Sequence, residues 1–173
     1  MRLQFSHVAL GLIFLGIVYL FVPVHVTVAP EWTVEVKDAE GRPMPGACVV
    51  QWWQHYSVED DNHEESILTD ESGLVSFPRR TLRASGWSRI IGAANNLRES
   101  GVHASFGPYS HVAAYKFGYG EMSHLDSQNT RWNGWGRLVN SHIILRRCPD
   151  GYTGLGCIMP TEYESSVPCG SLR

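Results

Sequence analysis

The fold is decided by the stretch Val34-x-Val36-x-Asp38-x-x-Gly41-x-Pro43-x-x-Gly46-Ala47-x-Val49. Trp32–Asp38 alternates apolar and polar residues, which predicts a half-buried strand. Gly41 can take a positive φ and Pro43 blocks continuation of the strand, so residues 39–43 are predicted to turn. A second strand follows over Ala47–Tyr56, and its core face begins at Ala47 and Val49.

Twenty residues later comes the motif Thr69-Asp70-x-x-Gly73-x-x-x-Phe77. Residues 60–65 are predicted to form a polar loop, Ser66–Thr69 a short strand, and residues 70–73 a tight turn into the strand Leu74–Phe77. Ser66–Thr69 and Leu74–Phe77 are therefore predicted to pair as a hairpin. Later strands are predicted over Ser110–Phe117 and Gly136–Arg146.

These motifs, with the late strand that ends in Gly118-Tyr119, resemble the carboxypeptidase regulatory-like domain. That family is a small β-sandwich of the transthyretin (prealbumin) type, which occurs as an appendage or free-standing module outside the cytoplasm. The resemblance implies an all-β, Greek-key β-sandwich over residues 30–148. It lapses over residues 79–107, which are read as a partly helical insertion. The apolar residues there recur at helical spacing, which predicts an amphipathic helix over Thr81–Leu97.

The N-terminus carries 21 residues, Val8–Val28, with no formal charge apart from His25. At helical rise they reach about 30 Å, the thickness of the hydrocarbon core of a bilayer. Arg2 precedes the segment and the next basic residue is Lys37, so the N-terminus is predicted to be cytoplasmic and the domain periplasmic or extracellular. Residues 1–29 are thus predicted to be a single-pass membrane anchor. The alternative is a signal peptide cleaved before Pro30, which would make the protein secreted.

Four cysteines in an exported chain predict disulfides. The segment Cys148-Pro-Asp-Gly-Tyr-x-Gly-x-x-Cys157 is similar to the closing loop of an epidermal-growth-factor-like module, and this resemblance implies a Cys148–Cys157 bond. Cys48 and Cys169 are then left to each other. Residues 149–173 are read as a disulfide-linked tail.

Charge is segregated along the chain. The net charge of −3 argues against a nucleic-acid binder. Glu59–Glu71 holds seven acids and no Lys or Arg, whereas Arg79–Arg98 holds five Arg and no acid. A basic, apolar helix can bind an anionic leaflet, and the candidates for that contact are Arg83, Arg89, Arg98 and Trp87. The alternative is that the apolar stripe caps one end of the sandwich.

Catalytic and metal chemistry find little support in the sequence. The eight His are not in metal-ligand spacing, and residues 60–65 lack the spacing of a calcium loop, so no cofactor is predicted. Hydroxyisourate hydrolases of the transthyretin type end in Tyr-Arg-Gly-Ser, but this chain ends in Cys-Gly-Ser-Leu-Arg. Intradiol dioxygenases use two Tyr and two His, and no motif of theirs surrounds Tyr109, His111, Tyr115 and Tyr119. A hydrolase is the less favoured function.

Two functions of different classes remain. The first is a non-catalytic, membrane-tethered module for protein interaction or envelope assembly. The second is a carbohydrate- or cell-wall-binding module, because exposed Trp faces stack on sugar rings. Trp132 and Trp135 are the main candidates for stacking, whereas core packing is the favoured role for Trp52 and Trp53.

Overall fold

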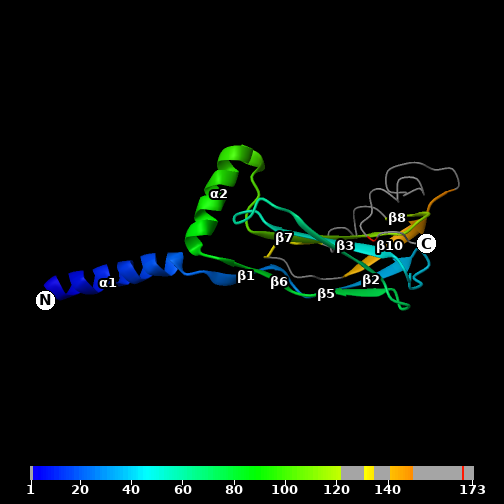
Figure 1. Cartoon of the computed structure of the whole chain (residues 1–173), viewed down its shortest axis with the longest axis horizontal. Helices are drawn as coiled ribbons and strands as arrows, with labels where there is room; N and C mark the ends of the chain where they lie inside the picture. The colour runs from blue at the N-terminus through cyan, green and yellow to red at the C-terminus, as the bar shows by residue number, and fades with distance from the viewer. Residues whose placement is uncertain (1, 122–130, 135–140, 150–168, 170–173) are drawn as a thin grey trace.

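The computed structural model describes residues 2–121, 131–134, 141–149 and 169, and it is mostly β (Figure 1). One sheet has the order β5-β2-β10-β8 and a second has the order β4-β3-β7-β9. The strands of the first sheet are β5 (Leu74–Phe77), β2 (Trp32–Asp38), β10 (His142–Arg147) and β8 (Tyr119–Glu121). Those of the second are β4 (His63–Leu68), β3 (Cys48–His55), β7 (Pro108–Tyr115) and β9 (Arg131–Trp132). The neighbours are antiparallel except for β2 and β10, which run parallel.

A further pair of strands forms a separate two-stranded sheet at the end of the first sheet. β1 (Val24–Ala29) pairs antiparallel with β6 (Arg80–Ala84), and β1 leads directly into β2 as β5 leads into β6. Pro30 and Pro78 stand at the two breaks, where a residue without an N–H cannot continue the ladder. The result is one long ribbon of four strands that lies along the second sheet (Figure 1).

The core lies between the two four-stranded sheets. Trp32, Val34 and Val36 of β2 pack there with Phe77, Ile143 and Leu145 of their neighbours. The second sheet contributes Val49, Val112 and Ala114. The alternation predicted for residues 32–38 and the inward direction of Ala47 and Val49 are therefore confirmed. The indole Nε1 of Trp32 donates to Oγ of Ser141 at 3.0 Å, so the buried ring leaves no unpaired polar atom.

Two helices and one short 3-10 turn complete the described chain. α1 (Arg2–Phe21) precedes β1, and α2 (Gly86–Ser100) leads into the turn at Gly101–His103. The predicted insertion helix is therefore right in kind but wrong at its start, because residues 80–84 pair with β1. Ser85 ends that pairing and caps α2, since its hydroxyl accepts from the Ser88 amide at 3.0 Å.

The N-terminal boundary also differs from the prediction. The predicted 21-residue segment Val8–Val28 is wrong at its end, because the helix stops at Phe21 and residues 24–29 form β1. Val28 and Ala29 are buried, so the sandwich begins before residue 30 and the boundary drawn there falls inside the fold. Among the helical side chains that the structure describes, no stretch is long and apolar enough to cross a membrane.

The predicted hairpin of residues 66–69 and 74–77 is wrong as well. β4 pairs with β3, whereas β5 pairs with β2 in the opposite sheet, so the turn between them crosses the sandwich. Residues 63–65, predicted as loop, belong to β4, which is an edge strand. Charged side chains such as Glu64 and Glu65 are common on edge strands because they discourage pairing with other chains.

The crossing turn itself is held by Asp70. Its Oδ1 accepts from the amides of Ser72 and Leu74, both at 2.9 Å, and from the Ser72 hydroxyl at 2.7 Å. Hydrogen bonds to the ionised form, led by that of Leu74, hold the pKa of Asp70 below its ordinary value of 3.8.

We therefore expect Asp70 to make stability depend on pH in acid. A carboxyl whose pKa is depressed by folding stabilises the native state above its unfolded pKa, and this contribution is lost as pH falls through the folded value. Asp70→Ala should lower the melting temperature at pH 7 and should flatten its decline below pH 4. Melting curves between pH 7 and pH 2 measure this. An equal decline in the variant and the parent would contradict it.

The Cys48–Cys169 bond is confirmed. The two Cα atoms lie 5.9 Å apart, and the bond spans 121 residues. No cysteine in the described part of the chain is free. Cys157 lies outside the described residues, so the Cys148–Cys157 bond and the rest of the tail from residue 150 stay predictions.

Candidate functional site

α2 rests on the end of the sandwich through small and polar residues. A Cβ built at Gly92 would overlap the carbonyl oxygen of Ser57, so the helix approaches that loop closely enough to require glycine. One turn further on, Nδ2 of Asn96 donates to the carbonyl oxygen of Tyr56 at 3.3 Å. Residues four apart lie on one face of a helix, so this face of α2 is the one turned toward the body.

The apolar side chains of α2 point elsewhere. Trp87, Ile90, Ile91 and Leu97 are each between 42% and 55% exposed, and no residue of α2 is buried. The stripe is therefore half exposed rather than fully buried against the sandwich, although Ile90 lines the space between α2 and the body. The Trp87 ring instead meets Phe21 at the end of α1, with the ring centroids 5.6 Å apart. Figure 1 shows α2 standing crosswise to α1 at the point where α1 meets the sandwich.

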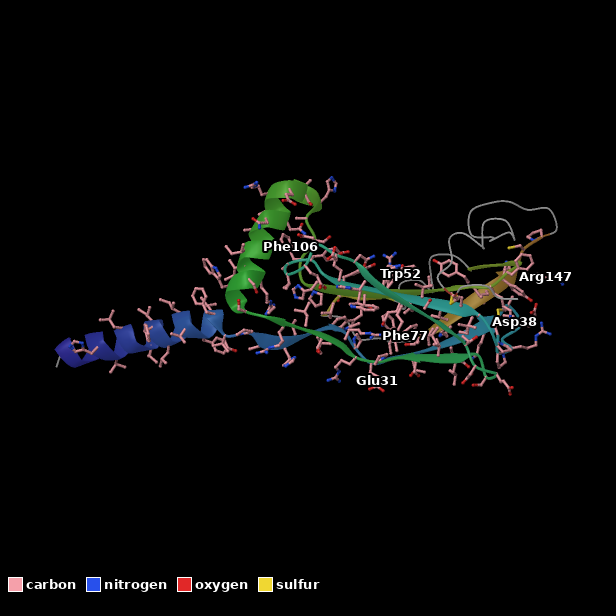
Figure 2. The ribbon with its side chains drawn as sticks, in the orientation of Figure 1. Glu31, Asp38, Trp52, Phe77, Phe106 and Arg147 are labelled. Carbon is pink, nitrogen blue, oxygen red and sulfur yellow. A yellow bond between two sulfur atoms is a disulfide. The ribbon has the colours of Figure 1, made fainter. Side chains whose placement is uncertain are left out.

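A cavity of about 460 Å³ lies beneath α2. Its apolar walls come from Leu20 of α1, from Ile90 and Ala93 of α2, and from Phe106, which Figure 2 shows beside α2. Its polar lining residues are His55, Ser57 and Arg89. The loop that forms its floor is held by the bonds Gly107 N–H to Ser57 Oγ, at 3.1 Å, and Tyr56 N–H to Gly107 O, at 3.0 Å.

His55 is the buried polar group of this cavity. Its side chain is fully buried, and Nδ1 accepts from the Ser57 amide at 3.3 Å, which leaves the proton of the neutral ring on Nε2. That N–H has no hydrogen-bond partner among the described residues. Burial lowers the pKa of His55, and the nearby positive charge of Arg89 lowers it further, so the ring is a neutral donor at pH 7.

The basic residues of the insertion divide into two groups. Arg80 lies over the Trp53 ring, 4.6 Å from its centroid, and forms an ion pair with Glu65, which joins the basic and acidic segments. Four others are exposed and form no ion pair within the described residues: Arg79, Arg83 on β6, and Arg89 and Arg98 on α2. The candidates Arg89, Arg98 and Trp87 thus share one helix, and Arg83 lies on the strand that leads into it.

Trp52, Trp53 and Trp132 are partly buried. Trp52 is stacked on His111 with centroids 4.7 Å apart and makes an edge-to-face contact with Tyr115, while Trp53 contacts both His63 and Arg80. Trp52 and Trp53 are both half-buried, although only Trp53 shares the inward face of Val49. Trp132 packs against the core rather than among surface aromatics, and Trp135 lies outside the described residues.

The tyrosine and histidine set does not converge on a metal site. Tyr109, His111 and Tyr115 share the outer face of β7, whereas Tyr119 packs against the core on the other sheet. Within the described residues no group of three or more His, Cys, Asp or Glu side chains is placed to hold a metal ion.

A second cavity, of about 430 Å³, lies at the end of the sandwich far from α1, where Figure 2 labels Asp38 and Arg147. Arg42 is paired there with Asp38 and Glu40, through bonds of 2.6 and 3.0 Å. Arg146 and Arg147 also line this cavity. It is a polar surface feature in which Asp38 and Glu40 are both paired with Arg42, whereas Arg146 and Arg147 form no ion pair within the described residues.

The cavity beneath α2 was not anticipated by sequence reasoning. The one signal was the alternation in β3, where Gln51, Trp53 and His55 follow Val49 on the inward face. Gln51 and Ser110, which lie on the same inward face as His55, are also fully buried and lack side-chain partners among the described residues.

No family model, no curated protein and no solved structure matches the chain.

Proposed function

We propose that the protein is a non-catalytic β-sandwich module tethered to a membrane by α1 and held outside the cytoplasm for protein interaction or envelope assembly. The observation that carries this proposal is the exposed apolar stripe of α2, which lies beside the end of α1 through the contact of Trp87 with Phe21. An apolar stripe on a helix bearing unpaired Arg residues is the composition of a helix that lies in a membrane interface.

The arrangement of the two helices supports this role. The 20 residues of α1 extend about 30 Å along the long axis of the molecule, and α2 runs across that axis (Figure 1). If α1 lies along the membrane normal, α2 lies flat on the surface with the sandwich beyond it. Trp is favoured at such interfaces, and each Arg near an anionic surface adds about 1 kcal/mol.

Two features support an anchored protein in an oxidising compartment. Disulfides such as Cys48–Cys169 persist outside the cytoplasm. Five of the six residues of β1 pair with β6, so cleavage before Pro30 would remove a strand of the fold and leave β6 unpaired. The resemblance to the carboxypeptidase regulatory-like domain, an appendage module, supports an interaction role rather than chemistry. Trp52 stacks on His111 and Trp53 contacts His63 and Arg80, so these rings already have partners within the protein and do not favour the glycan-binding alternative.

Lipid quenching of tryptophan fluorescence tests the membrane contact. We expect brominated phosphatidylcholine to quench the tryptophan fluorescence of the full chain in vesicles. Trp87→Phe should remove most of this quenching, because Trp87 would lie at the membrane interface. Trp52→Phe is the matched control and should retain it. Quenching that survives Trp87→Phe would show that α2 does not touch the bilayer.

The tether and the interaction role need separate measurements. A mature N-terminus at Pro30, found by mass spectrometry, would disprove the tether. Cross-linked affinity capture from detergent-solubilised membranes that recovers the protein alone would argue against an interaction role.

A further inference from the structure

The cavity beneath α2 continues toward α1. A smaller space of about 80 Å³ shares Leu20, Gly86 and Arg89 with it and is otherwise lined by Tyr19, Val22 and Val24. The two spaces therefore meet at Arg89 and follow the apolar end of α1. Combined, they resemble ligand sites in proteins, which are mostly apolar with a few placed polar groups.

Two polar groups in this space call for a negatively charged ligand atom. The buried Nε2–H of His55 is a donor without a partner, and a buried donor left unpaired destabilises the fold. Arg89 supplies a positive charge that no described carboxylate neutralises. A carboxylate or phosphate oxygen can accept from both groups, since charge-assisted hydrogen bonds are the strong ones.

We propose that this cavity binds the anionic head of a single-chain amphiphile, with the acyl chain along Leu20, Ile90 and Phe106. The head pairs with Arg89, and it accepts from Nε2 of His55 once the ligand has displaced the side chains that close this ring off from solvent. The proposal rests on the membrane-facing position of α2, because the cavity then opens beside the outer leaflet from which such an amphiphile would enter. A neutral head would leave the Arg89 charge unpaired, so anionic amphiphiles are selected.

The test uses the full-length protein with ¹⁵N-labelled histidine in dodecyl maltoside, a neutral amphiphile. Titration with dodecyl phosphate should give a saturable shift of the His55 Nε2 signal. Arg89→Gln should weaken binding by about tenfold, since it removes one charged hydrogen bond. Arg98→Gln, the matched loss of charge on the same helix but outside the cavity, should change affinity by less than about twofold. Ala93→Phe should fill the cavity and abolish the shift.

The comparison ligands identify the chemistry. Inorganic phosphate should leave the His55 signal unchanged, and an equal shift would overturn the acyl part of the proposal. Dodecanoate should also bind. If dodecanoate binds more tightly than dodecyl phosphate, the site selects a carboxylate head, as in a fatty acid; the reverse order indicates a phosphate head. No saturable shift, or an equal shift in Ala93→Phe, would overturn the site.

Failure of this site is distinguishable from failure of the proposed membrane role. If dodecyl phosphate shifts His55 while Trp87 escapes quenching by brominated lipid, the site stands and the membrane contact is wrong. If Trp87 is quenched and dodecyl phosphate has no effect, the membrane contact stands and the site is wrong.

Discussion

Replacing Cys169 by Ala should lower the free energy of unfolding by about 4–5 kcal/mol, the largest loss expected from a single substitution outside the core. A disulfide stabilises mainly by restricting the unfolded chain, and a loop of roughly 100 residues gives about 4.7 kcal/mol in the chain-entropy model. The Cys48–Cys169 bond spans 121 residues. Urea unfolding under non-reducing conditions measures the loss.

The variant Cys48→Ala with Cys169→Ala separates the cross-link from side-chain packing. Cys48 is fully buried at the start of β3, between Leu68 of β4 and Tyr115 of β7. If the cross-link dominates, the double variant should be about as unstable as Cys169→Ala alone. A loss below about 1 kcal/mol in Cys169→Ala would show that the bond restricts the unfolded chain little.

Local pattern predicted the strands of this fold, but it did not predict which strands pair. The alternation of Val34 and Val36 and the turn at Gly41, which has φ of 80°, are properties of neighbouring residues. Whether the Asp70–Gly73 turn reverses within a sheet or crosses between sheets depends on the core at both ends. Phe77 packs beside Trp32, and that contact places β5 next to β2.

The N-terminal error has a similar cause. Val24, Val26 and Val28 alternate with polar residues or alanine, which is a strand period, yet they follow an apolar run of helical length. Hydropathy alone extends the run through them. The pairing of β1 with β6 ends it, and that pairing depends on residues 80–84, which the sequence assigned mostly to a helix.

The candidate site combines a predictable part with a part that needs the fold. Spacing predicted that Trp87, Ile90 and Ile91 would share one face of a helix, but spacing cannot tell whether that face meets the body or the surroundings. The answer comes from Gly92, where close backbone contact with Ser57 turns that side of α2 inward. Trp87 and Ile91 are left half exposed, while Ile90 lines the cavity. His55 can act as the donor of the proposed site only because that contact holds α2 above it.

Gly92→Ala should therefore destabilise the protein, by about 1–3 kcal/mol, although the same change in an open helix is stabilising. Alanine exceeds glycine in helix propensity by about 1 kcal/mol. At Gly92, however, the new Cβ would overlap the Ser57 carbonyl oxygen, a backbone atom that cannot rotate away as a flexible side chain can. The helix must shift, and it then loses the bond from Asn96 to Tyr56.

Gly16→Ala in α1 is the matched control, because a Cβ there meets nothing within 4 Å. It should leave stability unchanged or slightly raised. Urea unfolding of both variants gives the sign, and the His55 signal reports the site, since a displaced α2 opens the cavity and should abolish the dodecyl phosphate shift. If Gly92→Ala stabilises the protein as Gly16→Ala does, α2 is not held against Ser57. The cavity, and with it the amphiphile site, would then have no fixed roof.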